Sequence, residues 1–129
     1  MRDVMSEQMV THAALLDANS RFYAAFRAGD MTSMASVWAR HLPVAVHHPG
    51  AGHMKGRASV LDSWRKILRS PPDVGCIVDT LLEDNDQWAV ICTERLGHIS
   101  LRMVNLLRQE NETWGMTYRG PAPDPRLRC

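Results

Sequence analysis

Hydrophobic positions in the first third of the chain recur with a helical period. Between about Met9 and Ala28 they return every three or four residues and form one broad apolar face, which predicts a long helix. Gly29 suits a left-handed helix end, and Asp30 suits the N-cap of a second, shorter helix. The apolar stripe of this second helix consists of Met31, Met34, Val37 and Trp38.

The pattern changes in the middle of the chain. Val44 and Val46 alternate with other residues within the segment Leu42–His48, which predicts a strand. Proline and glycine residues at positions 49–52 end this strand. A third helix is predicted from about Arg57 to Arg69, because its apolar residues again follow helical spacing. These residues are Val60, Leu61, Trp64, Ile67 and Leu68.

The last third of the chain alternates with a period of two, which predicts an antiparallel meander. The four expected strands are Val74–Leu82, Trp88–Leu96, His98–Leu107 and Thr113–Arg119. The two middle strands are apolar on both faces, whereas a sheet face in contact with water would be polar. We therefore expect the helices to cover one face and a second copy of the chain to cover the other, giving a homodimer through the sheet face.

Composition sets the class of protein. The chain has 129 residues, of which 45% are hydrophobic and 22% charged, so it can bury the core of one domain. We expect a single domain over residues 1–120 and an extended tail over 121–129. The formal net charge is +1 and no Lys/Arg cluster occurs, which argues against nucleic acid or a membrane surface as partner. No apolar run is long enough to span a bilayer, and residues 1–12 lack the apolar segment of a secretion signal.

The cysteines show no metal-binding spacing. Their odd number, without a secretion signal, suggests free thiols in a reducing compartment, so we expect a cytoplasmic protein. A hairpin turn at positions 85–86 would place Cys76 and Cys92 several residues out of register, too far apart for a disulfide. The expected cross-strand partners are Arg95 for Cys76 and Asp79 for Cys92; the third cysteine is Cys129.

The predicted order of elements is also that of the nuclear transport factor 2-like superfamily, and specific motifs strengthen this resemblance. The segment Ala18–Asp30, with the sequence ANSRFYAAFRAGD, resembles the first-helix motif of SnoaL-like proteins. Further matches to SnoaL-like motifs are Val37-Trp38-Ala39, His48-Pro49-Gly50, Gly56-Arg57 and the segment from Val60 to Leu68. Together these matches cover most of residues 18–72, and Asn105 and Trp114 extend them into the last strands.

The resemblance implies a fold and several possible functions. The fold is α+β, a cystatin-like cone in which three N-terminal helices pack in the concave face of a strongly curved, mainly antiparallel sheet, usually as a homodimer. The superfamily includes isomerases, cyclases, dehydratases and proteins without catalysis, and a fold does not fix a function. Our first hypothesis is a homodimeric domain that binds an unknown small organic ligand. The alternatives are a lyase, isomerase or hydrolase that uses His48 as general acid or base, and a dimerisation module with a filled cavity.

His48 is the candidate catalytic residue. In the ketosteroid isomerase branch an Asp precedes the matching proline and acts as general base, and a histidine before Pro49 could do acid–base work near neutral pH. The alternative is a hydrogen-bonded histidine that only lines a pocket. That branch also has a Tyr oxyanion donor where this chain has Phe22, and Tyr23 lies about 100° further round the helix. Steroid isomerisation is therefore not expected.

Other residues are candidates for the pocket wall, with core packing as the alternative for each. Asn19 interrupts an apolar helix face, and a buried amide must find a partner in ligand, water or backbone. Asn105 resembles an Asn that faces the cavity in SnoaL-like proteins. Tyr118 and Arg119 stand where many relatives carry histidines and could bind a polar or acidic ligand group, with a solvent-facing Arg119 as the alternative. Glu94 is either a cavity carboxylate or part of an edge ion pair. The full set of pocket candidates is Asn19, Tyr23, Trp38, His48, Trp64, Asn105 and Tyr118.

Three histidines lie close together in sequence, at His47, His48 and His53. Adjacent strand residues point to opposite faces, so His47 and His48 cannot readily share one ion. No acidic residue or cysteine lies nearby in sequence to complete a site. We therefore assign no metal site and no cofactor.

Overall fold

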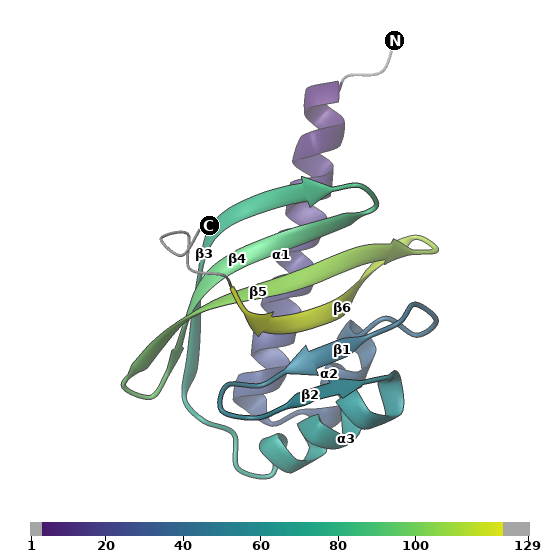
Figure 1. The fold of residues 1–129 in the computed structure, drawn as a ribbon. Helices are drawn as coiled ribbons and strands as arrows, with labels where there is room; N and C mark the ends of the chain where they lie inside the picture. The colour runs from purple at the N-terminus through teal and green to yellow at the C-terminus, as the bar shows by residue number, and fades with distance from the viewer. Residues whose placement is uncertain (1–3, 123–129) are drawn as a thin grey trace, which may run out of the picture.

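The computed structural model describes residues 4–122 and shows three helices and a six-stranded, curved, mixed sheet. In Figure 1, α1 runs behind the long strands, and α3 lies at one end beside β1 and β2. The elements are α1 Val4–Ala28, α2 Met31–Val37, β1 Ala45–His47, β2 His53–Lys55, α3 Arg57–Leu68, β3 Val74–Asp84, β4 Gln87–Leu96, β5 Ile99–Glu110 and β6 Thr113–Pro121.

The strand order in the sheet is β2-β1-β6-β5-β4-β3. β3 to β6 form an antiparallel meander, and β1 pairs in parallel with β6 and antiparallel with β2. This arrangement confirms the predicted α+β cone with a mainly antiparallel sheet. None of the helices within residues 4–122 has the length and apolar character needed to cross a membrane.

Two elements differ from the prediction. The strand β2 was not predicted, because three residues with one half-buried side chain carry no readable alternation. The helix α1 begins at Val4 and not near Met9. Its first turns extend past the sheet (Figure 1), and Met9 and Val10 are 70% and 69% exposed. The apolar stripe in the sequence therefore predicts only the part of α1 that packs on the core.

The turn between α1 and α2 follows the predicted chemistry. Gly29 has φ +65°, and a Cβ at this position would lie 3.0 Å from the carbonyl oxygen of Leu68. The carboxylate of Asp30 accepts a hydrogen bond from the backbone N–H of Ser33 at 3.1 Å, as an N-cap should. This tight turn allows α2 to fold back against the core.

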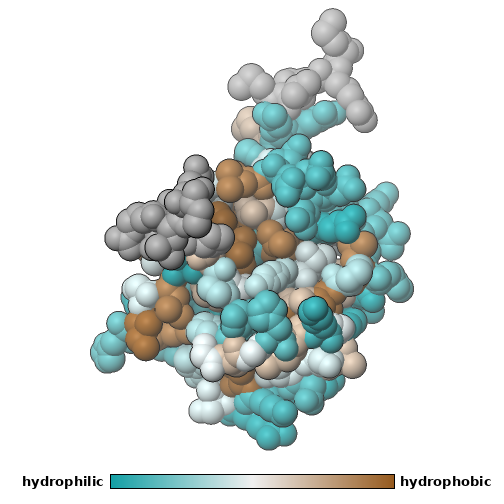
Figure 2. Space-filling model, viewed as in Figure 1, coloured by the Kyte–Doolittle hydropathy of each residue, from teal (hydrophilic) through white to brown (hydrophobic). Residues whose placement is uncertain are grey.

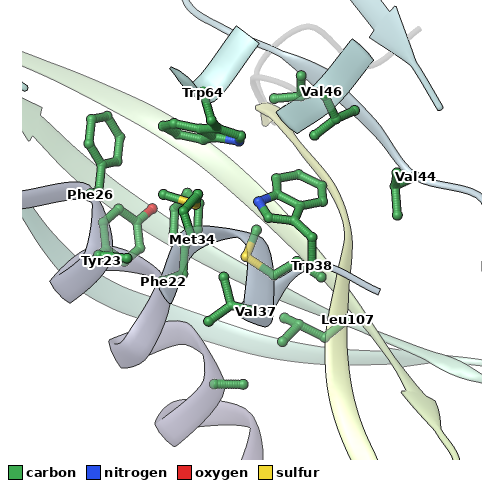
Figure 3. Packing of buried hydrophobic residues seen from close by; sticks show 14 of the residues in the cluster. Phe22, Tyr23, Phe26, Met34, Val37, Trp38, Val44, Val46, Trp64 and Leu107 are labelled. Atoms are coloured by element: carbon green, nitrogen blue, oxygen red, sulfur yellow. The ribbon is translucent and has the colours of Figure 1, made fainter. Parts of the chain in front are cut away.

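The core is built around aromatic rings that meet edge to face. Figure 3 shows Phe22 and Phe26 of α1 facing Trp64 of α3 and Trp38 at the end of α2. The ring centroids of Phe22 and Trp64 are 5.4 Å apart, and those of Phe26 and Trp64 are 4.9 Å apart. Such pairs contribute about 0.5–1.5 kcal/mol each beyond area burial. They fix α3 relative to α1, and so fix the side chains that α3 directs inward.

Two charged side chains hold the segment between α2 and β1. The guanidinium of Arg57 donates to the carbonyl oxygens of Ala35, in the last turn of α2, and of Trp38 and Ala39, which follow it, at 2.8–2.9 Å. The carboxylate of Glu110 accepts hydrogen bonds from the backbone N–H groups of residues 40, 41 and 42 at 2.6–2.8 Å. Both groups satisfy backbone atoms that no regular element pairs, and they direct the chain into β1.

Two irregularities in the sheet decide which side chains point inward. Pairing between β5 and β6 shifts between Leu106 and Leu107, which leaves Thr117 as the extra residue of a bulge. Strict alternation from the buried Met116 would have turned Tyr118 inward. The bulge reverses the alternation, so Arg119 is inside, 1% exposed, and Tyr118 lies on the outer face.

The second irregularity lies between Val78 and Thr80, where β3 pairs with β4. It places Cys76 opposite Glu94, and Cys92 opposite Val78. The expected partners, Arg95 and Asp79, were wrong by one position. The two cysteines are consequently diagonal neighbours on the inner face of the sheet.

Candidate functional site

A row of buried polar side chains crosses the interior between the helices and the sheet. Such residues are rare in cores unless they are paired, because each must give up its hydration. They come from six different elements or their ends, so only the folded chain brings them together. The row consists of Asn19 and Tyr23 from α1, His48 after β1, Ser63 from α3, Glu94 from β4, Asn105 from β5 and Arg119 from β6.

An ion pair lies at the centre of this row. The Nη2 group of Arg119 donates to Oε1 of Glu94, and the Tyr23 hydroxyl donates to Oε2 of Glu94 at 2.6 Å. The Glu94 side chain is 0% exposed. The guanidinium carbon of Arg119 lies 5.5 Å from the ring centroids of both Phe26 and Trp64, which is within cation–π distance. The aromatic core thus surrounds the pair on the helix side.

On one side of the ion pair, the row continues through His48. The hydroxyl of Ser63 donates to the carbonyl oxygen of Val60 at 2.6 Å, so it must accept from His48 Nε2–H at 2.9 Å. The other ring nitrogen, Nδ1, then accepts from Arg119 Nη1 at 3.2 Å. Burial, followed by the charge of Arg119 and by His47, lowers the pKa of His48 to about 4. His48 is therefore a neutral imidazole with both nitrogens engaged.

On the other side, the row continues through two amides. Asn105 Nδ2 donates to Asn19 Oδ1 at 2.8 Å and to the Tyr23 hydroxyl oxygen at 3.2 Å. Asn19 Nδ2 in turn lies 3.8 Å from the sulfur of Cys76. Burial and the charge of Glu94 raise the pKa of Tyr23, so its hydroxyl keeps its proton and serves as a donor.

Hydrogen-bonding capacity remains in this network. Arg119 Nε, Asn105 Oδ1 and the indole N–H of Trp64 are buried and have no partner among residues 4–122. A buried polar atom without a partner costs about 1–3 kcal/mol. These atoms can accept or donate to a bound molecule at no further desolvation cost to the protein.

The row of buried polar side chains reaches the surface at two hollows. The larger, about 520 Å³, lies between α3 and the segment after β1. His48 and Ser63 contribute polar atoms to its wall, and Pro49, Met54 and Ile67 contribute apolar surface. A hollow of about 230 Å³ lies at the opposite end of the row, between α1 and β3, and is lined by Asn19, Tyr23 and Cys76 among others.

The structure brings four of the predicted pocket residues into this network: Asn19, Tyr23, His48 and Asn105. Trp64 packs against it, with its ring centroid 4.7 Å from that of His48. Trp38 belongs to the aromatic core, and Tyr118 lies outside the network, with its hydroxyl folded over Gly120 on the outer face. The bulge in β6 is the physical reason for the placement of Tyr118.

Sequence reasoning missed part of the network. Ser63 was not singled out, and Glu94 and Arg119 were each left with an alternative at the surface. Glu94 itself indicated a buried site, because it is a carboxylate flanked by apolar residues in a central strand. Ser63 carried no signal, because a serine within an amphipathic helix is common.

The three neighbouring histidines do not form one group. His47 and His53 are cross-strand partners whose ring centroids are 4.3 Å apart, whereas the ring of His48 points into the interior. In the described part of the chain, no three His, Cys, Asp or Glu side chains come together closely enough to hold a metal ion.

Comparison with known proteins adds a family and a set of solved structures. The SnoaL-like domain family matches residues 15–120. No curated protein matches the chain. A protein from Thiobacillus denitrificans, provisionally described as a calcium/calmodulin-dependent protein kinase type II association domain, is 27% identical with a TM-score of 0.71. The match covers 82% of this chain and 93% of that one.

Two further structures share the fold at lower identity. A protein from Streptomyces avermitilis, provisionally described as a dehydratase of the nuclear transport factor 2-like family, is 23% identical, with a TM-score of 0.69 over 87% of this chain and 96% of that one. A ketosteroid isomerase-like protein from Erwinia carotovora atroseptica is 14% identical, with a TM-score of 0.68 over 83% and 91%. These two likenesses concern the fold alone.

Proposed function

The chain belongs to the SnoaL-like domain family, and on that premise we propose that it binds a small organic molecule through the buried polar row, with Arg119 as the main anchor. The Glu94–Arg119 ion pair supports this proposal most strongly. A buried ion pair is often no more stable than apolar residues of the same volume, so stability alone does not account for it. An arginine held in place by Glu94 and by two aromatic rings is preorganised to receive an oxygen acceptor.

The larger hollow defines the ligand that fits. Its volume of about 520 Å³ is within the range of small-molecule sites, roughly 300–1,000 Å³. Apolar wall residues such as Met54 and Ile67 suit a hydrocarbon body, and His48 and Ser63 offer polar contacts on the side nearest to Arg119. We propose a mostly apolar ligand with a carbonyl or carboxylate oxygen directed at Arg119.

Arg119→Lys should weaken binding of such a ligand about 5- to 150-fold, because lysine keeps the charge and loses the planar fork, a loss of about 1–3 kcal/mol. Ligands would first be found by thermal-shift screening of small carboxylates and ketones, and their Kd then measured by calorimetry. Arg108→Lys is the matched control, since Arg108 lies on the outer face of the same sheet and forms an ion pair with the exposed Asp86. Equal Kd values for wild type and Arg119→Lys would contradict the proposal.

A second candidate function is acid–base catalysis by His48, as in a lyase, isomerase or hydrolase. The observation that favours it is the position of a neutral imidazole at the wall of the larger hollow. In this arrangement the lone pair of Nδ1 is engaged by Arg119. A ligand oxygen that draws Arg119 away would free Nδ1 to accept a proton. Binding therefore comes first in this proposal, and catalysis requires the ligand to rearrange the network.

We also propose that a second copy of the chain covers the outer face of the sheet. Figure 2 looks onto this side, where apolar patches alternate with hydrophilic ones. Ile91, Val104 and Leu106 are half-buried there. Ile91 of β4 lies opposite Val104 of β5, and Leu106 follows Val104 on the same face of β5. Open apolar patches of this kind mark association surfaces. A dimerisation module with a filled interior is the third candidate, and it would share this interface without the ligand.

Val104→Glu should convert the dimer to a monomer, because it buries two like charges at the interface. Sedimentation at micromolar concentration should give about twice the chain mass of 14.5 kDa for the wild type. The variant should sediment with the mass of one chain. Ile99→Glu is the control, because it makes the same apolar-to-charged change at the exposed end of the hairpin between β4 and β5. This variant should sediment with the mass of the wild-type dimer. A monomeric wild type would exclude the dimer.

A further inference from the structure

Three buried N–H groups in the interior have no hydrogen-bond partner within residues 4–122. They are Nε–H of Arg119 and the indole N–H groups of Trp38 and Trp64, and all three side chains are at most 1% exposed. The guanidinium carbon of Arg119 lies 5.5 Å from the centroid of the Trp64 ring. Figure 3 shows the nitrogen of each indole on the side that faces the other ring. Donors from β6, from α3 and from the end of α2 therefore border one region of the core.

The charges and the acceptors beside these donors are already matched. Glu94 is the counter-ion of Arg119, and its other oxygen accepts from the Tyr23 hydroxyl. Nδ1 of His48 accepts from Arg119 Nη1. Arg119 thus uses both terminal nitrogens within the protein and keeps Nε–H for a bound molecule. The unpartnered acceptor of the row, Asn105 Oδ1, belongs to the other side of the ion pair, beside Tyr23.

His48 separates these donors from the larger hollow. It lines the hollow of about 520 Å³, and its ring centroid is 4.7 Å from that of Trp64. Arg119 contacts the same ring at Nδ1 and is itself buried. The donors are therefore one side chain away from the space that would hold the proposed ligand. Turning the ring of His48 aside would open the way to them and would release Arg119 Nη1 as a further donor.

We infer that the indole N–H of Trp64 and Nε–H of Arg119 donate to a carbonyl oxygen of the ligand, so that the site takes a neutral ketone and rejects the matching alcohol and carboxylate. This inference rests on the proposed binding function and narrows its ligand class. An alcohol brings a proton into a region whose nearest acceptors are engaged, and a buried polar group without a partner is costly. A carboxylate brings a second negative charge beside Glu94, which Arg119 already balances.

Nitrogen–proton correlation spectra of the full chain test this inference, with cyclohexanone, cyclohexanol and cyclohexanecarboxylate as matched probes. The chain has four tryptophans, whose indole signals are assigned by replacing each with Phe in turn. Cyclohexanone should move the Trp64 signal downfield and saturably, because a new hydrogen bond deshields the indole proton. The signals of Trp88 on β4 and Trp114 on β6 are internal controls and should stay in place.

The same titrations give the selectivity. At neutral pH the Kd of cyclohexanone should be about 5- to 150-fold lower than that of cyclohexanol, the range for one buried polar group left without a partner. The carboxylate should bind more weakly still, because the cost is larger for a charged group. Trp64→Phe keeps an aromatic ring and removes the N–H, so it should narrow the ratio between ketone and alcohol. Trp88→Phe is the matched control and should leave this ratio unchanged.

The wild-type shifts and ratios decide the inference even if Trp64→Phe does not fold. A Trp64 signal that cyclohexanone leaves in place would overturn it, and so would a carboxylate or an alcohol that binds as tightly as the ketone. The proposed binding function is judged separately, by Arg119→Lys. Weaker binding of any probe to that variant would support the binding function even where the ketone selectivity fails, whereas equal affinities would contradict the binding function itself.

Discussion

Glu94→Leu should lower the free energy of unfolding by about 3–5 kcal/mol, because it leaves a buried guanidinium without a counter-ion. Arg119 is 1% exposed and its other contacts, the ring nitrogen of His48 and two aromatic faces, carry no negative charge. Tyr23 loses its acceptor in the same variant. Urea denaturation followed by far-ultraviolet circular dichroism measures this loss.

The double variant Glu94→Leu/Arg119→Met should recover most of the loss and reach the wild-type value to within about 1 kcal/mol, since well-packed apolar residues replace buried ion pairs at little cost. Asp79→Ala is the control for an exposed pair, because Asp79 and Arg102 are 3.6 Å apart at the surface. It should cost less than about 1 kcal/mol. A double variant as unstable as Glu94→Leu would mean that the ion pair is required for the fold, and the main support for a ligand-binding role would be lost.

The helices could be predicted because each packs one continuous stripe on the core. Val60, Trp64 and Leu68 are spaced at four residues, and all three are buried. The same rule fails at the start of α1, where residues 7–10 are exposed. It also fails for β2, whose pairing with β1 comes from the hairpin after His48 and not from its own side chains. Tertiary contacts determine both of these elements.

The site was harder to predict than the fold because the side chains that face it depend on the register of strand pairing. Asn19 was found as a polar residue on an apolar helix face, Asn105 by its resemblance to an asparagine of SnoaL-like proteins, and Tyr23 as a possible aromatic wall of the pocket. Arg119 faces the interior only because a bulge inserts one residue in β6, and no alternation rule reveals a bulge. The ion pair also joins residues 25 positions apart in sequence, on strands that are not neighbours in the sheet. Such pairs become visible only when the strand order and curvature are known.

The direction of the hydrogen bonds links the two halves of the row. Within residues 4–122, Arg119 donates to both Glu94 and His48, so a ligand that moves Arg119 would change the proton affinity of both groups. Removing Arg119 from His48 would raise the affinity of the imidazole for a proton, because the nearest positive charge would be gone. Burial and Arg119 therefore keep His48 neutral in the free protein, and under the proposed binding function a ligand would end the effect of Arg119.

Stability should fall as the pH is lowered from 6.5 towards 4, and His48 should account for about 2–3 kcal/mol of that loss. The pKa of His48 is about 4 in the folded chain, against an ordinary value of 6.5. The unfolded chain therefore binds the proton first, and the stabilisation, complete above pH 6.5, is lost as the pH falls through this window. The groups that face the ring are Arg119 from β6, Ser63 and Trp64 from α3, and His47 beside it, and none carries a negative charge that could favour the imidazolium.

His48→Gln isolates this contribution, because glutamine can still donate to Ser63 and accept from Arg119 but cannot be protonated in this range. Urea unfolding of both proteins between pH 4 and pH 7.5 should show the wild type losing stability more steeply below pH 6.5, so that the difference between the two curves changes by about 2–3 kcal/mol across this range. Carboxylates that titrate in the same window act on both proteins and cancel in the difference. Parallel curves for wild type and His48→Gln would show that His48 is not held neutral by burial and Arg119.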